Sequence, residues 1–193
     1  MERSDRELVR AARRGDKEAF RELVERYQRK IVSVAVGMVH NPEDAIEIAQ
    51  ETFIKAFQNL DKFKGESSFY TWLYRIVVNR AIDFQRRERR HPTVPLEDPA
   101  APGNIAGEGY EQYLKEERPT DPYHQAQAHE VGDRVTEAIN ELTPDHKAVI
   151  LLREVEGLSY DEISKVMQCS KGTVMSRLHY ARKKLQKKLK DLV

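Results

Sequence analysis

Four aromatic side chains between residues 69 and 74 form the part of the sequence best suited to binding nucleic acid. Phe69, Tyr70, Trp72 and Tyr74 lie within six residues, and Trp72 is the only tryptophan of the chain. A basic segment at residues 86–90 follows on the same expected helix. Rings can stack on bases and cations can bind phosphates, a combination found in surfaces that bind single-stranded nucleic acid.

The same stretch also fits an ordinary amphipathic helix. Its apolar residues recur at intervals of three and four, namely Phe69, Trp72, Leu73, Ile76 and Val77. Some of the rings must therefore belong to a core. Trp72 is the ring that we expect there, whereas for Tyr74 both a core position and a DNA contact stay open.

Residues that could carry catalysis or hold a metal ion are scattered along the chain. The glycines are isolated, so no phosphate-binding loop is expected. The six histidines show no metal-ligand spacing, and the single cysteine excludes a disulfide framework and a cysteine-based zinc site. Asp44, Glu47 and Glu51 share one expected helix face without matching ligands on a second helix, which favours an exposed binding face. We expect no enzyme, no metal site and no cofactor.

The composition is that of a charged, helix-rich protein. The 193 residues suffice for one or two small domains, with 39% hydrophobic and 34% charged residues. A net charge of only +1 conceals a basic C-terminal end, in which residues 171–193 carry eight cations against Asp191. No apolar run approaches the ~20 residues of a membrane span, and the polar N-terminus does not resemble a secretory signal. A cytosolic protein is expected.

Helix-start and helix-stop signals predict four helices before residue 91. The expected spans are residues 5–14, 16–40, 42–60 and 69–90. Asn41 and Pro42 mark the third start, because Asn caps helices and Pro fits their first position. Gly65 breaks the pattern before the fourth helix, which Ser67 or Ser68 should cap. The third helix should direct these apolar residues inward: Ala45, Ile46, Ala49, Phe53, Ala56, Phe57 and Leu60.

The segment between the two halves of the chain differs in composition. Six of the eight prolines lie between residues 92 and 122, among glycines and many acidic residues. Few of its residues could build a core, so a flexible linker is expected. The predicted organisation is an N-terminal domain at residues 1–91, a linker at residues 92–132 and a C-terminal domain at residues 133–193.

The C-terminal domain shows the pattern of a helix-turn-helix. Ser159 and Glu162 match a capping box, which predicts a short helix. A break at residues 168–171 separates it from a longer basic helix, an order typical of proteins whose second helix enters the DNA major groove. An ordinary helical hairpin could look alike. The expected fold class is all-α, with two small helical domains joined by a flexible acidic Pro/Gly-rich linker.

Three segments resemble bacterial sigma factors of the extracytoplasmic-function (ECF) group, group IV of the sigma-70 family. They read DAIEIAQETFIKAF at residues 44–57, FYTWLYRIVVN at residues 69–79, and GLSYDEI with GTVMSRL at residues 157–163 and 172–178. The resemblance extends over nearly the whole chain and is closest to the envelope-stress subgroup. It implies a transcription initiation factor that binds core RNA polymerase and directs it to promoters, with sigma region 2 before the linker and region 4 after it.

For region 2, the resemblance implies contacts with polymerase and with the −10 element. The third helix would bind the β′ clamp helices through Asp44, Glu47, Gln50, Glu51, Phe53 and Ile54. The loop at residues 63–69 would take up a base flipped out of the −10 element, which would be read as a single strand. The residues implied for this strand and its phosphates are Lys64, Ser67, Phe69, Tyr70, Asn79, Arg80, Arg86, Arg87 and Arg90.

For region 4, the resemblance implies that the last helix reads the −35 element as duplex DNA, with a further polymerase contact at the β flap. The implied residues are Lys171, Thr173, Met175, Ser176, Arg177, His179, Tyr180, Arg182 and Lys183. Met175, His179 and Tyr180 stand where the subgroup often has Arg, Phe and Arg. The usual −35 preference therefore cannot be assumed for this chain.

The resemblance also implies an anti-sigma protein as a partner, which would hold a cytoplasmic factor inactive and could keep it at the inner membrane. Two other classes stay open from the residues. A stand-alone helix-turn-helix regulator would bind duplex DNA tightly as a dimer, without any use for a base-capturing loop. An RNA-binding protein would leave the helix-turn-helix half without a role.

Overall fold

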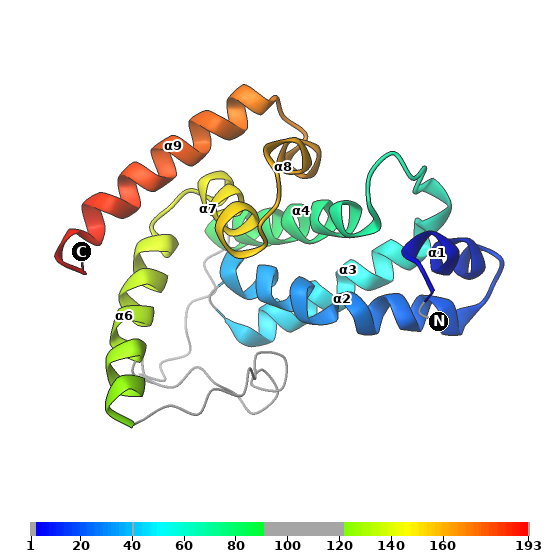
Figure 1. The fold of residues 1–193 in the computed structure, drawn as a ribbon, viewed down its shortest axis with the longest axis horizontal. Coiled ribbons are helices and arrows are strands. Elements are labelled where there is room, and N and C mark those ends of the chain that lie inside the picture. The colour runs from blue at the N-terminus through cyan, green and yellow to red at the C-terminus, as the bar shows by residue number, and fades with distance from the viewer. Residues whose placement is uncertain (1–2, 40, 91–121, 193) are drawn as a thin grey trace. The chain divides into compact units, whose positions relative to one another are not determined.

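The computed structural model describes residues 3–39, 41–90 and 122–192, and all regular elements in these ranges are helices (Figure 1). The chain divides into two compact units, the first holding the helices before residue 91 and the second most of the helical residues after residue 121. Residues 160–164 belong to the second unit, in which Tyr160 and Asp161 contact Arg153 and Lys171. The all-α expectation is confirmed.

The first unit contains α1 (Asp5–Arg13), α2 (Lys17–Met38), α3 (Pro42–Gln58), a 3₁₀ turn (Leu60–Lys62) and α4 (Phe69–Arg90). Their boundaries follow from caps in the sequence. Ser4 and Glu7 form a capping box on α1, Asp16 caps α2, and Asn41 caps α3 with Pro42 at its first position. Gly15, at φ +95°, makes the turn between α1 and α2.

Helices α2, α3 and α4 pack against one another, and α1 packs on α2 (Figure 1). The core is aliphatic at the centre of this bundle, where its fully buried side chains include Leu23, Ile31, Val34, Met38, Ala45, Leu73, Val77 and Val78. Each buried Leu, Ile or Val contributes about 1.5–3 kcal/mol through removal of apolar surface from water. This core fixes α3 and α4 as rigid supports for the side chains on their outer faces.

One face of α3 differs from the sequence expectation. Phe57, expected inward, is exposed and lies against Phe20 with ring centroids 4.9 Å apart. Ile48 and Thr52 are buried in its place, and the Thr52 hydroxyl donates to the Ile48 carbonyl at 2.7 Å. Because this local bond satisfies the hydroxyl, a threonine can occupy a core position that the hydrophobic pattern assigned elsewhere.

The second unit contains α6 (Pro122–Asn140), α7 (Pro144–Ile150), a π-helical segment (Leu151–Val155), α8 (Tyr160–Met167), α9 (Lys171–Lys188) and a final turn (Lys190–Leu192). Helix α6 begins inside the range expected to be linker, so residues 122–132 are helical. The rest of that range, residues 92–121, lies outside the described residues.

The caps of the second unit match the expected helix-turn-helix. Glu162 accepts hydrogen bonds from the backbone and hydroxyl of Ser159 at 2.9 and 2.7 Å, which completes the predicted capping box. Ser170 caps α9 by accepting from the Thr173 amide at 3.1 Å. Helix α9 packs on α7 through Val174, Leu178 and other buried residues, so its opposite side faces solvent.

Candidate nucleic-acid interface

The loop at residues 63–69 stands on a floor of aromatic rings. The centroid of the Phe63 ring lies 5.7 Å from that of Phe69 and 5.3 Å from that of Trp72, and Phe69 and Trp72 are 5.8 Å apart. Phe69 is 2% exposed and Trp72 6% exposed. Edge-to-face and tilted ring contacts of this kind hold their partners in fixed orientations. Trp72 is in the core, as expected, and so is Tyr74.

Above this floor, the tip of the loop is exposed. Lys64, Gly65, Glu66 and Ser68 are exposed, and Gly65 adopts φ +75°, where a residue with a Cβ is strained. The Ser68 hydroxyl accepts from the Thr71 amide at 3.2 Å, so Ser68 is the residue that caps α4. The chain thus forms a sharp, exposed polar turn next to a cluster of buried rings.

The residues expected to contact the −10 strand take up three kinds of position. Lys64, Asn79, Arg86, Arg87 and Arg90 are exposed, whereas Ser67 and Tyr70 are half-buried. Phe69 is different, because its ring also contacts Tyr27 at 5.9 Å and is covered on its other sides by Phe63 and Trp72. In this arrangement Phe69 supports the loop and offers no free face to a base.

An ion pair between Arg80 and Glu51 connects the surface expected to bind DNA with the surface expected to bind polymerase. The Arg80 guanidinium of α4 donates a hydrogen bond to the Glu51 carboxylate of α3. The Nε atom of Arg80 is buried and has no hydrogen-bond partner among the described residues. A residue expected on the DNA side is therefore held by one expected on the polymerase side, a contact that sequence spacing does not reveal.

The outer face of α3 combines acids with exposed apolar side chains. Glu47 and Gln50 are exposed, Asp44 and Phe53 are half-buried, and Ile54 is 57% exposed. Burial raises the pKa of Asp44, and the carboxylates of Glu88, Glu47 and Glu43 add to the rise. Phe57 and Phe20 extend the apolar part beyond the residues expected from the sequence. Such a mixed face fits a protein partner better than nucleic acid.

The solvent side of α9 presents several exposed side chains. Met175 is 55% and Tyr180 61% exposed, and the ring of Tyr180 lies edge-on to that of His179 at 5.5 Å. His179 and Lys183 are also exposed. These side chains spread along successive turns of one rigid helix, the arrangement that a duplex-reading helix requires.

Other residues expected on the −35 element already have partners in the protein. Ion pairs join Lys171 to Asp161 at 2.8 Å, Arg177 to Asp145 at 3.3 Å and Arg182 to Glu154 at 2.6 Å. Lys171 and Arg182 are exposed, and exposed pairs are weak enough to be exchanged for phosphates.

The remaining polar residues at the start of α9 make local bonds. Arg177 is half-buried, and the Thr173 hydroxyl lies 2.9 Å from that of Ser170. The Ser176 hydroxyl donates to the Thr173 carbonyl at 3.0 Å. Thr173 and Arg177 therefore help to hold the helix-turn-helix in shape.

Neither a metal centre nor a membrane span is found in the described part of the chain. No group of three or more His, Cys, Asp or Glu side chains there could hold a metal ion. No helix within the described ranges is long and apolar enough to cross a membrane.

Comparison with known families assigns both halves of the chain. Sigma-70 region 2 matches residues 23–91 and sigma-70 region 4 matches residues 132–185. The chain belongs to the sigma-70 family of RNA polymerase sigma factors, in its ECF group. It is a sigma factor for transcription initiation, and its relatives are initiation factors rather than enzymes.

Individual relatives agree over almost their entire length. The RNA polymerase sigma-H factor of Pseudomonas aeruginosa is 41% identical, with 98% of this chain and 95% of the relative covered. The ECF RNA polymerase sigma-E factor of Haemophilus influenzae is 39% identical, with 98% and 97% covered. Among solved structures, CnrH in complex with the cytosolic domain of CnrY matches with a TM-score of 0.64 and 25% identity, covering 97% of each chain.

Proposed function

We propose that this sigma factor reads the −10 element as a single strand through its first unit and the −35 element as a duplex through α9. The observation that carries the proposal is the contrast between a polar turn on buried aromatic rings in the first unit and exposed side chains along α9 in the second. A flipped base requires an enclosing site, because leaving the stack costs a few kcal/mol that pocket contacts must offset. A duplex requires side chains that project from a rigid helix into the groove.

Within the first unit, the loop tip would enclose the base and the exposed cations would bind the strand. Lys64 and Ser67 lie at the tip, and Asn79 lies further along α4. Arg86, Arg87 and Arg90 in the last turns would contact phosphates. The buried position of Phe69 makes it part of the floor in this proposal, and the half-buried Tyr70, whose ring contacts that of Tyr74, is more exposed than Phe69.

Core polymerase would bind the outer face of α3. The proposed contacts are Asp44, Glu47, Gln50 and Glu51 at the polar part, and Phe53 and Ile54 at the apolar part, on the β′ clamp helices. The second unit would add a contact with the β flap. The 57% exposure of Ile54 supports this assignment, since an exposed apolar side chain within an acidic face is typical of a transient protein interface.

An anti-sigma protein is the second proposed partner. A solved structure of similar fold, that of the sigma factor RpoE from Bartonella quintana, is a complex with the anti-sigma factor NepR. In this chain the same kind of partner would compete with polymerase for the α3 face, including exposed Phe57. The factor would then act in the cytoplasm, where polymerase is, and a membrane-attached inhibitor could hold it at the inner membrane.

The test is abortive transcription by core polymerase mixed with the full chain, on a library that varies the −35 and −10 elements. Initiation from a defined subset of promoters, dependent on both elements, is expected. Tight duplex binding by the protein alone, together with failure to bind core polymerase, would contradict the proposal and favour a stand-alone regulator.

A further inference from the structure

Helix α1 is bonded to the start of the loop at residues 63–69. Arg13, in the last turn of α1, donates from Nε to the Leu60 carbonyl at 3.0 Å and from Nη2 to the Phe63 carbonyl. Phe63 is the first residue of the loop, and its ring is part of the floor. A side chain 50 positions earlier in the sequence therefore fixes the backbone where the loop begins.

The other end of α1 is connected to the end of the loop. Asp5 accepts a hydrogen bond from the Tyr27 hydroxyl and pairs with Arg26 at 2.7 Å. The Tyr27 ring lies 5.9 Å from Phe69, the last residue of the loop. Burial, and then the bond to Asp5, raise the pKa of Tyr27, so its hydroxyl keeps the proton that this bond requires.

The tip of the loop depends on these two ends for its position. Lys64, Gly65 and Glu66 are exposed, and a Cβ added at Gly65 would meet no atom within 4 Å. The Ser67 hydroxyl bonds only locally among the described contacts, to the Ser68 carbonyl at 3.3 Å. Because the tip makes so few contacts of its own, the contacts of the first and last residues of the loop determine its position.

We propose that α1 is a positioning element for the base-capturing loop, with Arg13 as the residue that sets where the loop begins. The match to sigma-70 region 2 starts at residue 23, so α1 precedes the matched segment. The inference rests on the proposed function of the loop. Arg13 touches no base in this account: it lowers the cost of ordering the loop when a base enters, because the loop is already held in place.

The guanidinium of Arg13 is suited to this role by its shape. Its planar fork donates two hydrogen bonds in fixed directions, here to two carbonyls of one turn. A lysine keeps the charge but presents a single ammonium without that fork. The substitution Arg13→Lys therefore separates the positioning effect from simple attraction between a cation and DNA.

The experiment uses holoenzyme assembled from the full chain and core polymerase. Fluorescence titration measures its affinity for a single-stranded −10 oligonucleotide and for the same strand with an abasic site at the captured base. The variants are Arg13→Ala and Arg13→Lys. The matched control is Arg14→Ala, because Arg14 is the next residue, is exposed and carries the same charge.

Arg13→Ala is expected to weaken binding of the intact strand about ten-fold and of the abasic strand less than about two-fold, as for the loss of charge-assisted hydrogen bonds that act only on the captured base. Arg13→Lys should show most of this loss, and Arg14→Ala neither loss. Equal losses on the two strands, or identical behaviour of Arg13→Ala and Arg14→Ala, would overturn the proposal.

Two further results keep the test decisive. If Arg13→Ala does not assemble into holoenzyme, Arg13→Lys and Tyr27→Phe carry the same comparison, since the latter removes only the hydroxyl that bonds Asp5. A selective loss on the intact strand for both supports the role of α1, and none for either contradicts it. If unsubstituted holoenzyme binds the intact strand and the abasic strand equally, wherever the abasic site is placed, the loop does not capture a base. The proposed role of α1 is then wrong as well.

Discussion

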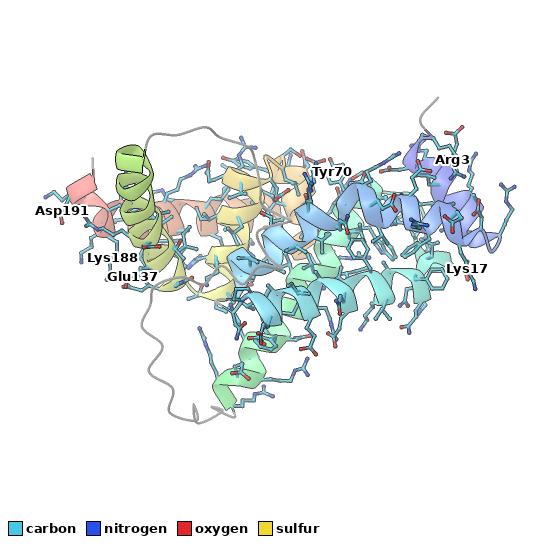
Figure 2. All side chains as sticks on the ribbon, turned by 90° about the horizontal axis from the view of Figure 1, so that it is seen from below. Arg3, Lys17, Tyr70, Glu137, Lys188 and Asp191 are labelled. Carbon is cyan, nitrogen blue, oxygen red and sulfur yellow. The ribbon has the colours of Figure 1, made fainter. Side chains whose placement is uncertain are left out.

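The two regions proposed to bind DNA in this sigma factor use aromatic side chains in opposite ways. In the first unit, the rings of Phe63, Phe69 and Trp72 are buried beneath the loop, and polar residues form the surface. In the second unit, Tyr180 and Met175 project from α9 into solvent, and buried aliphatic residues lie beneath them. Figure 2 shows side chains projecting from the helices of both units, with Tyr70 labelled on the first.

The proposed ligands of the two regions, an extruded base and a duplex groove, would explain the difference. An extruded base must be enclosed, so the enclosing turn needs a stable floor whose rings are not themselves available. A duplex groove is a ready-made surface, so the reading side chains must be exposed on a helix held from behind. The aromatic residues of a sequence therefore do not by themselves locate a base contact. Only rings that are exposed in the folded protein can contact a base.

Removal of the floor should have the largest effect. Trp72→Ala is expected to lower the free energy of unfolding of the first unit by about 3–5 kcal/mol, because it leaves a large cavity in a packed ring cluster. Tyr180→Ala is the matched change on α9, and we expect it to alter stability by less than about 0.5 kcal/mol. Denaturant unfolding of both variants measures this; equal destabilisation would show that the two regions are not built differently.

The residues on α9 should control duplex reading without affecting stability. Tyr180→Ala and Met175→Ala are expected to cost about 1–3 kcal/mol of discrimination at individual −35 positions, if the side chains contact base edges. Lys183→Ala should weaken binding of all sequences alike. It should also lower the slope of log affinity against log salt concentration by about 1, because one phosphate contact is lost. Titration of holoenzyme on −35 variants at several salt concentrations separates the two; sequence-independent loss for Tyr180→Ala would contradict its reading role.

A pair of identical substitutions at glycine compares the loop with the helix directly. Gly65→Ala should destabilise the first unit by about 1–2 kcal/mol, because Gly65 has φ +75°. Gly172→Ala, at a helical position of α9 where a Cβ finds only the Ser170 hydroxyl at 3.7 Å, should stabilise the second unit by about 0.5–1 kcal/mol. Thermal unfolding measures both changes in stability. If Gly65→Ala stabilises the first unit, the turn at Gly65 does not need a residue without a Cβ.

The Glu51–Arg80 pair should have the smallest effect. Glu51→Gln leaves Arg80 without its ionic partner, and the isolated protein is expected to bind a single-stranded −10 oligonucleotide up to about five-fold more tightly, the range of a partly exposed ion pair. Glu25→Gln, which breaks the exposed pair with Arg21 on α2, is the control. Unchanged or weaker binding by Glu51→Gln would mean that the pair does not restrain Arg80.

Local signals in the sequence were sufficient for much of the fold. Asn41 with Pro42 and Ser159 with Glu162 predict helix starts because caps act within a few residues of the chain. The position of Trp72 follows from helical spacing. The sequence pattern did not predict the exposure of Phe57, because it favours an apolar residue over Thr52 for the core, whereas Thr52 is buried with its hydroxyl bonded to the Ile48 carbonyl.

The candidate site was less predictable, because its contacts join distant parts of the sequence. The Glu51–Arg80 pair spans 29 positions and the Arg13–Phe63 bond spans 50, and neither follows from periodicity. The resemblance implies Phe69 at the DNA surface, and ring type and spacing alone do not distinguish a buried ring from an exposed one. The start of α6 was hidden by the proline-rich, acidic composition that precedes it.

The most direct test of the account is the affinity of holoenzyme for promoters melted in advance at one element. Mismatches across the −10 element should tighten binding, because the cost of opening and extruding the base has been removed. Mismatches across the −35 element should weaken it, because α9 loses its duplex. If melting has the same effect at both elements, or tightens binding at −35, the assignment of single-strand reading to the first unit and duplex reading to the second is wrong.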